Sequence, residues 1–99
     1  MPISLLEDET LKFWDRYIVG AKVTIDGQEI DYPIFQKRIE ERFLKIFVHL
    51  QSETGHVTRA KIVDSHGREV RYRDMNIKKN EDGLMVTFIL GIRIEEVTG

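Results

Sequence analysis

The chain has 99 residues, the size of a single domain that can bury a hydrophobic core without disulfide or metal staples. It contains no cysteine, which excludes disulfides, thiolate zinc sites and cysteine nucleophiles and fits maturation in a reducing cytoplasm. Because 15 Lys and Arg nearly balance 17 Asp and Glu, we expect neither nucleic acid nor acidic lipid as a partner. The amino-terminal residues lack a basic leader and no apolar run is long enough to span a membrane, so we expect a soluble cytoplasmic product.

Residues 1–20 are predicted to form an amino-terminal helix or arm. Ser4 and Glu7 have capping-box spacing, and Gly20 stands where a helix would stop. At about 100° per residue, one broad apolar arc gathers five side chains: Leu11, Phe13, Trp14, Tyr17 and Ile18. An extended conformation ranks second, because charged Asp15 would then lie on the apolar side.

Residues 21–99 are predicted to form the β domain, which begins with a hairpin. Apolar and polar residues alternate on both sides of Asp26 and Gly27, a pair suited to the positive φ angles of a tight turn. Pro33 cannot donate a ladder hydrogen bond, so the second strand should lie at an edge or end there. For residues 36–42 the pattern leaves an extended chain and a short helix both open.

Residues 43–50 are predicted to form a strand with apolar groups on both faces. One face has Leu44, Ile46, Val48 and Leu50, and the other has Phe43, Lys45, Phe47 and His49. This pattern is typical of a central strand, or of one covered by the amino-terminal helix or by another subunit. The chain has more large aromatic side chains before residue 50 than one thin sandwich can easily bury. They are Phe13, Trp14, Tyr17, Phe43 and Phe47. Core packing is favoured and a subunit interface is the alternative.

The remaining strands are predicted at 57–64, around Val70 and Tyr72, and at 84–94, with turns at 65–67 and 80–83. In the last strand six apolar residues share one face: Leu84, Val86, Phe88, Leu90, Ile92 and Ile94. Short strands joined by turn residues indicate a mainly β fold. We expect a single antiparallel β-sandwich or partly open barrel with a short amino-terminal helix.

Groups that could perform chemistry are sparse. Asp64, Ser65 and His66 contain the three group types of a hydrolytic triad, but side chains of neighbouring turn residues diverge, and these residue types also stabilise turns. His49, His56 and His66 lack the spacing of a metal site, and the seven glycines form no phosphate loop. We therefore expect no catalytic residue, cofactor or metal ion.

A locally basic stretch follows this turn. It contains Arg68, Arg71, Arg73, Lys78 and Lys79, and acidic residues interrupt it. We interpret it as a solvated strand face and turn rather than as a phosphate-binding site.

Three stretches of the sequence carry a family resemblance. They are AKVTIDG (21–27) leading to YPI (32–34), VTRAKIVDSHGREV (57–70), and NIKK (76–79) followed by DGLMVTF (82–88). Over roughly residues 20–97 the chain resembles small tail-module proteins of phages and prophages of Gram-positive bacteria, and more distantly the amino-terminal domain of phage tail-collar fibres. The resemblance implies a non-enzymatic β domain that assembles into a tail, baseplate or fibre attachment as a symmetric oligomer.

The leading hypothesis is a virion structural or adaptor protein, made in the host bacterial cytoplasm, that contacts other tail or baseplate proteins and copies of itself. Its candidate interface residues are Leu11, Phe13, Trp14, Tyr17, Ile18, Phe43 and Phe47. The alternative is a β-sandwich module that binds a carbohydrate or a host protein. That function requires exposed rings, such as Tyr32 or Tyr72, beside polar residues.

Overall fold

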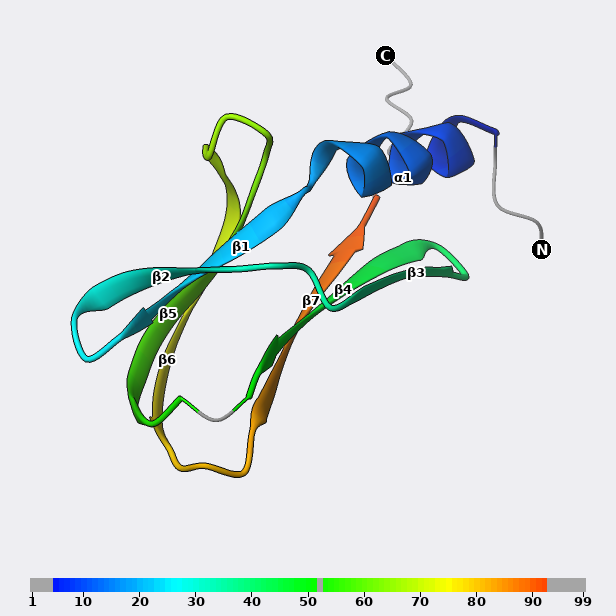
Figure 1. The fold of residues 1–99 in the computed structure, drawn as a ribbon. Coiled ribbons are helices and arrows are strands. Elements are labelled where there is room, and N and C mark those ends of the chain that lie inside the picture. The colour runs from blue at the N-terminus through cyan, green and yellow to red at the C-terminus, as the bar shows by residue number, and fades with distance from the viewer. Residues whose placement is uncertain (1–4, 52, 93–99) are drawn as a thin grey trace, which may run out of the picture.

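The computed structural model describes residues 5–51 and 53–92, in which one helix precedes seven strands (Figure 1). The elements are α1 (Leu5–Tyr17), β1 (Gly20–Ile25), β2 (Gln28–Tyr32), β3 (Gln36–Glu40), β4 (Phe43–Leu50), β5 (Gly55–Val63), β6 (Glu69–Lys79) and β7 (Leu84–Gly91). The strands form a four-stranded sheet in the order β2-β1-β5-β6 and a three-stranded sheet in the order β3-β4-β7, with antiparallel pairing throughout. The fold is mainly β, as predicted. The capping residue Ser4 and the last apolar position, Ile94, lie outside the described residues.

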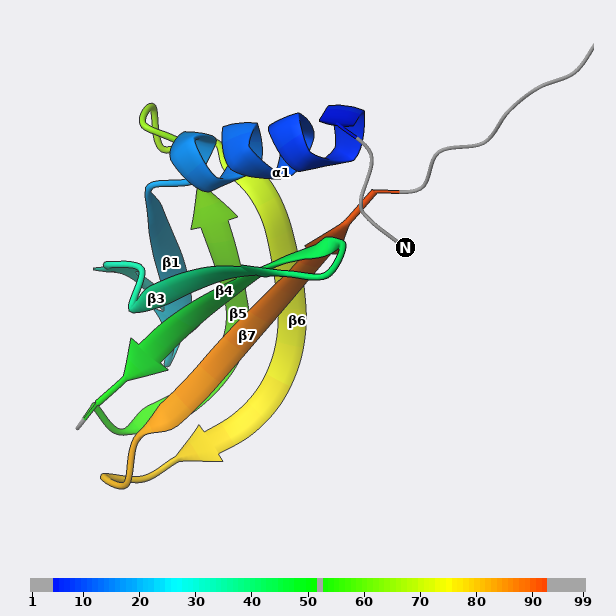
Figure 2. The same cartoon turned by 90° about the vertical axis from the view of Figure 1, so that its right-hand side faces the viewer.

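The hydrophobic core lies between the two sheets, and α1 crosses one end of it (Figure 2). From β4 the core receives Leu44, Ile46, Val48 and Leu50, which pair with Leu90, Phe88, Val86 and Leu84 of β7. The four-stranded sheet contributes Ala21, Val23, Ile25, Val57, Ala60 and Ile62. Each large apolar side chain that is fully buried stabilises the fold by about 1.5–3 kcal/mol. The predicted faces of β4 and β7 are thus confirmed, and β4 is the central strand of its sheet.

The predicted hairpin turn between β1 and β2 is confirmed. Asp26 and Gly27 have φ angles of 52° and 80°. The Asp26 carboxylate accepts the His56 N–H at 2.9 Å, which fastens this turn to the start of β5. Gly55 leaves room for that contact, since a Cβ there would lie 2.5 Å from the carboxylate. As expected, β2 ends before Pro33.

The open question at residues 36–42 is settled in favour of the extended chain. β3 pairs along its whole length with β4, for example Ile39 with Leu44, and Glu41 turns the chain with a φ of 56°. A helix there is wrong, because the ladder to β4 satisfies the backbone groups of this segment instead.

The helix ends at Tyr17, earlier than the predicted stop at Gly20, which is the first residue of β1. The Val19 N–H donates to the Val63 carbonyl at 3.0 Å and so joins the chain to β5. Pairing with a strand far along the sequence therefore ends the helix, and the left-handed glycine cap that the sequence indicated is not used.

Lys37 of β3 holds the carboxyl-terminal end of α1. Its ammonium donates to the Ile18 carbonyl at 3.0 Å and to the Asp15 carbonyl, and it lies 3.5 Å from the Asp15 carboxylate. These carbonyls are the ones that a helix end leaves without partners, and a cation there also complements the helix dipole. Lys37 thus fixes the position of α1 over the core.

Lys79 corrects the expectation that the basic stretch is solvated. It is 5% exposed, and its ammonium donates to the carbonyls of Gln51 at 2.7 Å, Asn80 at 2.9 Å and Glu53. Buried charges persist when several hydrogen bonds satisfy them. Lys79 therefore joins the end of β6 to the loop between β4 and β5.

Candidate functional site

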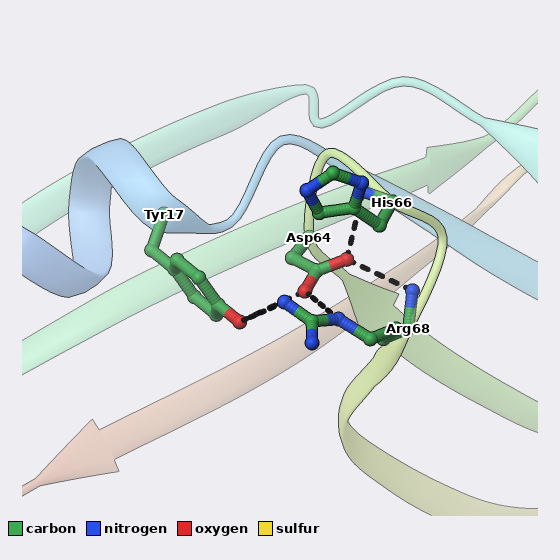
Figure 3. Close-up of polar contacts among 4 residues, drawn as sticks. All are labelled: Tyr17, Asp64, His66 and Arg68. Carbon is green, nitrogen blue, oxygen red and sulfur yellow. Dashed lines mark hydrogen bonds and ion pairs between the residues drawn. The ribbon is translucent and has the colours of Figure 1, made fainter.

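Asp64, from the run that resembles a hydrolytic triad, is a buried carboxylate directly after β5. It is surrounded by Tyr17, His66 and Arg68 (Figure 3). Asp64 is 2% exposed. One carboxylate oxygen accepts the main-chain N–H groups of His66 and Arg68, both at 2.9 Å. The other accepts the Arg68 Nε at 2.7 Å and the Tyr17 hydroxyl at 2.8 Å. The carboxylate therefore joins the 65–67 turn to the last residue of α1.

The electrostatics of this cluster favour a structural role. Burial alone would raise the pKa of Asp64, but hydrogen bonds from the Arg68 main chain, the Tyr17 hydroxyl, the Arg68 guanidinium and the His66 main chain outweigh it. They hold that pKa well below its ordinary value. The hydrogen bond to Asp64 in turn raises the pKa of Tyr17. The main-chain N–H of His66 donates to the Asp64 carboxylate. Across residues 5–51 and 53–92, the His66 ring forms no hydrogen bond with Ser65.

The three histidines lie in separate surroundings. His49 packs beside Phe35 with ring centroids 5.4 Å apart, and the His56 ring contacts the Asn76 side-chain oxygen. His66 lies in the turn after β5. Within the described part of the chain, no group of three or more His, Cys, Asp or Glu side chains is placed to hold a metal ion.

The outer side of the three-stranded sheet carries an apolar surface, which we call the aromatic face. It consists of Phe35, Phe43, Phe47, His49, Met85 and Ile89. The strand residues among them alternate with the buried residues of β4 and β7 and so point away from the core. Phe35 and Ile89 are each 58% exposed, Met85 is 45% exposed and Phe43 is 41% exposed.

Charged groups of β3 and β4 lie beside and within the aromatic face, and Lys45 projects between Phe43 and Phe47, opposite Ile89. Glu40 lies 3.2 Å from Arg38 and 3.0 Å from Lys45, and the Arg38 guanidinium lies 5.1 Å from the centre of the Phe47 ring. The hydrogen bond from Lys45, and then the charges of Arg38 and Lys45, lower the pKa of Glu40. Two cations share one carboxylate, so this surface has an unmatched positive charge.

The outer side of the four-stranded sheet, which we call the charged face, is different. Its members are Lys22, Glu29, Asp31, Arg59, Lys61, Tyr72 and Asp74. Lys61 lies 3.0 Å from Glu29, and Arg59 lies 2.7 Å from Asp74 and 4.6 Å from the centre of the Tyr72 ring. Each of these cations lies near a carboxylate, although Lys22 and Lys61 are direct cross-strand neighbours, and such mixed charge is typical of a face in contact with water.

The structure divides the predicted helix residues into two groups. Leu11 and Ile18 are 0% exposed and half-buried Trp14 packs against the same core. Leu11 and Ile18 therefore have no surface to offer a partner, which corrects their place in the candidate interface. Phe13 and Tyr17 are exposed and stack on each other with ring centroids 5.5 Å apart. The end of the barrel accepts a narrow stripe of α1 rather than the whole apolar arc.

The candidate strand residues Phe43 and Phe47 lie together on the aromatic face, but sequence reasoning missed their neighbours Phe35, Met85 and Ile89. The signal for Met85 and Ile89 was their position on the outward side of an alternating strand, where apolar residues are not needed for the core. Nothing local distinguishes Phe35, whose position depends on the path of the chain between the sheets.

The two tyrosines of the alternative hypothesis differ. Tyr32 is 8% exposed and belongs to the core, so it cannot stack on a ligand. Tyr72 is 49% exposed on the charged face.

Comparison of the chain with protein-family models, curated proteins and solved structures finds no match. Among the described residues, no helix has the length and apolar character needed to cross a membrane. The surfaces of the protein therefore provide the basis for inferring its function.

Proposed function

We propose that this protein is a non-enzymatic assembly or adaptor subunit and that the aromatic face is its main contact surface with other proteins. The supporting observation is the exposure of Phe35, Phe43, Met85 and Ile89 on one sheet face. Contiguous apolar groups at a surface mark interaction sites, and aromatic, Met and Arg side chains are the types enriched there. Arg38, stacked on Phe47, adds to this composition.

We further propose that the assembly is a phage or prophage tail, baseplate or fibre attachment, with the protein located in the virion. This finer assignment is supported by the resemblance of residues 20–97 to small tail-module proteins. The resemblance implies a symmetric oligomer, so the proposal includes contacts between copies of this chain as well as with other tail or baseplate proteins.

The proposal is tested by sedimentation velocity over a range of protein concentrations. We expect the wild type to associate, and the double variant Phe43→Ser, Phe47→Ser to remain monomeric, because it removes both β4 phenyl rings of this surface. Tyr72→Ser is the matched control, since it removes an exposed ring from the charged face instead. Circular dichroism establishes that each variant is folded. Association that survives the double substitution, or a wild type that is monomeric at every concentration, would contradict the proposal.

A second candidate function is supported by Tyr72, whose exposed ring lies beside the Arg59 guanidinium. Sugars stack on exposed aromatic faces next to hydrogen-bonding groups, so the charged face is a candidate carbohydrate site. A glycan array screened with the wild type and with Tyr72→Ala tests this function. A glycan that binds the wild type and is lost in the variant supports it, and an array without any binding contradicts it.

A further inference from the structure

Two unpaired strand edges face each other along one side of the barrel. In the part of the chain that the structure describes, β6 pairs with β5 alone and β7 pairs with β4 alone. The two strands follow one another through the 80–83 turn and splay apart toward α1 (Figure 1). We call this opening the seam.

The seam contains a hollow of about 350 Å³ at the end nearest α1. Its lining residues come from three elements: Trp14, Val70, Arg71, Ile89, Leu90 and Gly91. Among the described residues of this lining, Arg71 is the one that is charged, and α1 contributes the indole of Trp14. Such a combination of apolar walls and one charged group can hold an apolar side chain and orient a polar one.

The edge of β7 presents main-chain groups to the seam. Arg73 of β6 donates to the Thr87 carbonyl at 3.3 Å, so this carbonyl points toward β6 rather than toward β4. In an antiparallel strand the N–H and C=O of one residue point the same way, and this direction repeats at every second residue. The N–H and C=O of Ile89 therefore also face the seam, beside the hollow. A free strand edge of this kind can pair with an added extended segment.

Arg71 provides the charge that selects among such segments. It pairs with Ile62 across the ladder, so its side chain leaves β6 on the core side of the sheet, at the open seam. Neighbouring arginines have carboxylate partners, Arg68 with Asp64 and Arg59 with Asp74. Over residues 5–51 and 53–92, Arg71 has neither a hydrogen bond nor an ion pair, although a guanidinium forms its strongest contacts with carboxylates.

We propose that the seam binds an extended segment of another protein by strand addition to β7 at Ile89. This segment places an acidic side chain beside Arg71 and an apolar side chain against Trp14. It enters between Arg73 and α1, where the edge is free and the hollow lies. The site adjoins the aromatic face, because the side chain of Ile89 belongs to that face while its main chain lies at the seam, and it gives the protein a second contact with a partner of different chemistry.

Binding is tested with a blocked hexapeptide of alternating valine and glutamate, and with the corresponding valine and lysine peptide as the comparison. Trp14 is the only tryptophan of the chain, so its fluorescence reports occupation of the hollow directly. We expect the acidic peptide to shift this emission saturably and the basic peptide to leave it unchanged. Loss of one hydrogen-bonded ion pair in Arg71→Ala should weaken binding about 10-fold to 100-fold. The control Arg38→Ala removes an exposed arginine from the opposite edge strand and should bind normally.

Amide hydrogen exchange distinguishes strand addition from simple adhesion. The Ile89 amide should exchange at least about tenfold more slowly with the acidic peptide bound, because it gains a hydrogen bond. An unchanged Ile89 amide, equal binding of both peptides, or full binding by Arg71→Ala would overturn the proposal. The single variant Phe47→Ser should still bind the peptide, because Phe47 pairs with Thr87, which does not line the hollow, and Arg71→Ala should still self-associate. Loss of self-association in Arg71→Ala would overturn the assignment of the seam to a different protein.

Discussion

The outer faces of the two sheets share one backbone geometry but carry opposite surfaces. On the four-stranded sheet, Lys22, Arg59 and Lys61 each lie near a carboxylate of a neighbouring strand. This face can therefore be solvated without a protein partner. On the three-stranded sheet, Phe43 and Ile89 also point outward and are 41% and 58% exposed. The alternation of the sequence therefore identifies which side chains point away from the core. The chemistry of those side chains is the basis for proposing that one face contacts water and the other contacts protein.

The largest effect on the free energy of unfolding should come from replacing a residue of β7 that faces the core rather than one that faces outward. Phe88→Ala should reduce the free energy of unfolding by about 3–5 kcal/mol, because it opens a cavity in the core. Ile89→Ala, at the next position, should change it by less than about 1 kcal/mol, since that side chain is already exposed. Urea denaturation measures both. Equal costs would show that the aromatic face is part of the folding core.

The next largest effect concerns the buried carboxylate of Asp64, directly after β5. Because the pKa of Asp64 is lower in the folded protein than in the unfolded chain, its contribution is complete above about pH 4 and is lost as the pH falls below that value. Asp64→Asn should lower the melting temperature at pH 7 by an amount on the order of 10 °C and flatten its decline between about pH 4 and pH 2. Asp74→Asn on the charged face is the control and should lower the melting temperature at pH 7 much less, because it removes only a surface ion pair.

The smallest effect compares two lysines of the four-stranded sheet, one buried and one half-buried on the charged face. Lys79→Met leaves three carbonyls without their donor and should cost about 1–2 kcal/mol. Lys61→Met on the charged face loses only a surface ion pair and should cost less than about 1 kcal/mol. Thermal unfolding of the two variants under the same conditions measures the two losses of stability. A larger loss in Lys61→Met would mean that the ion pairs of the charged face support the fold.

Local patterns in the sequence were sufficient for several parts of the fold. Asp26 and Gly27 adopt the φ angles that a tight hairpin needs, and the 43–50 strand has the predicted limits and the central position. The alternation of the last strand is confirmed from Leu84 to Gly91. In each case neighbouring residues determine the conformation, so a one-dimensional pattern contains the necessary information.

The parts that escaped prediction depend on partners far along the chain. The Tyr17 hydroxyl and Asp64 are 47 positions apart, and Lys37 reaches back to the end of α1. Periodicity placed Phe13 on the apolar arc of the helix, but the width of the barrel end decides how much of that arc is buried. The seam could not be predicted from the sequence either, because it depends on two strand edges, those of β6 and β7, that do not pair with each other over their described residues.

The position of β1 has a consequence for how the chain acquires its structure. β1 pairs with β5 from Gly20 opposite Val63 onward, so both β3 and β4 must be synthesised before β1 gains its second neighbour. Until then the β1–β2 hairpin has an open side that other chains can join. We therefore expect folding to be limited by this late, long-range closure, on a timescale of milliseconds to seconds that is usual for β proteins, with aggregation as its competitor.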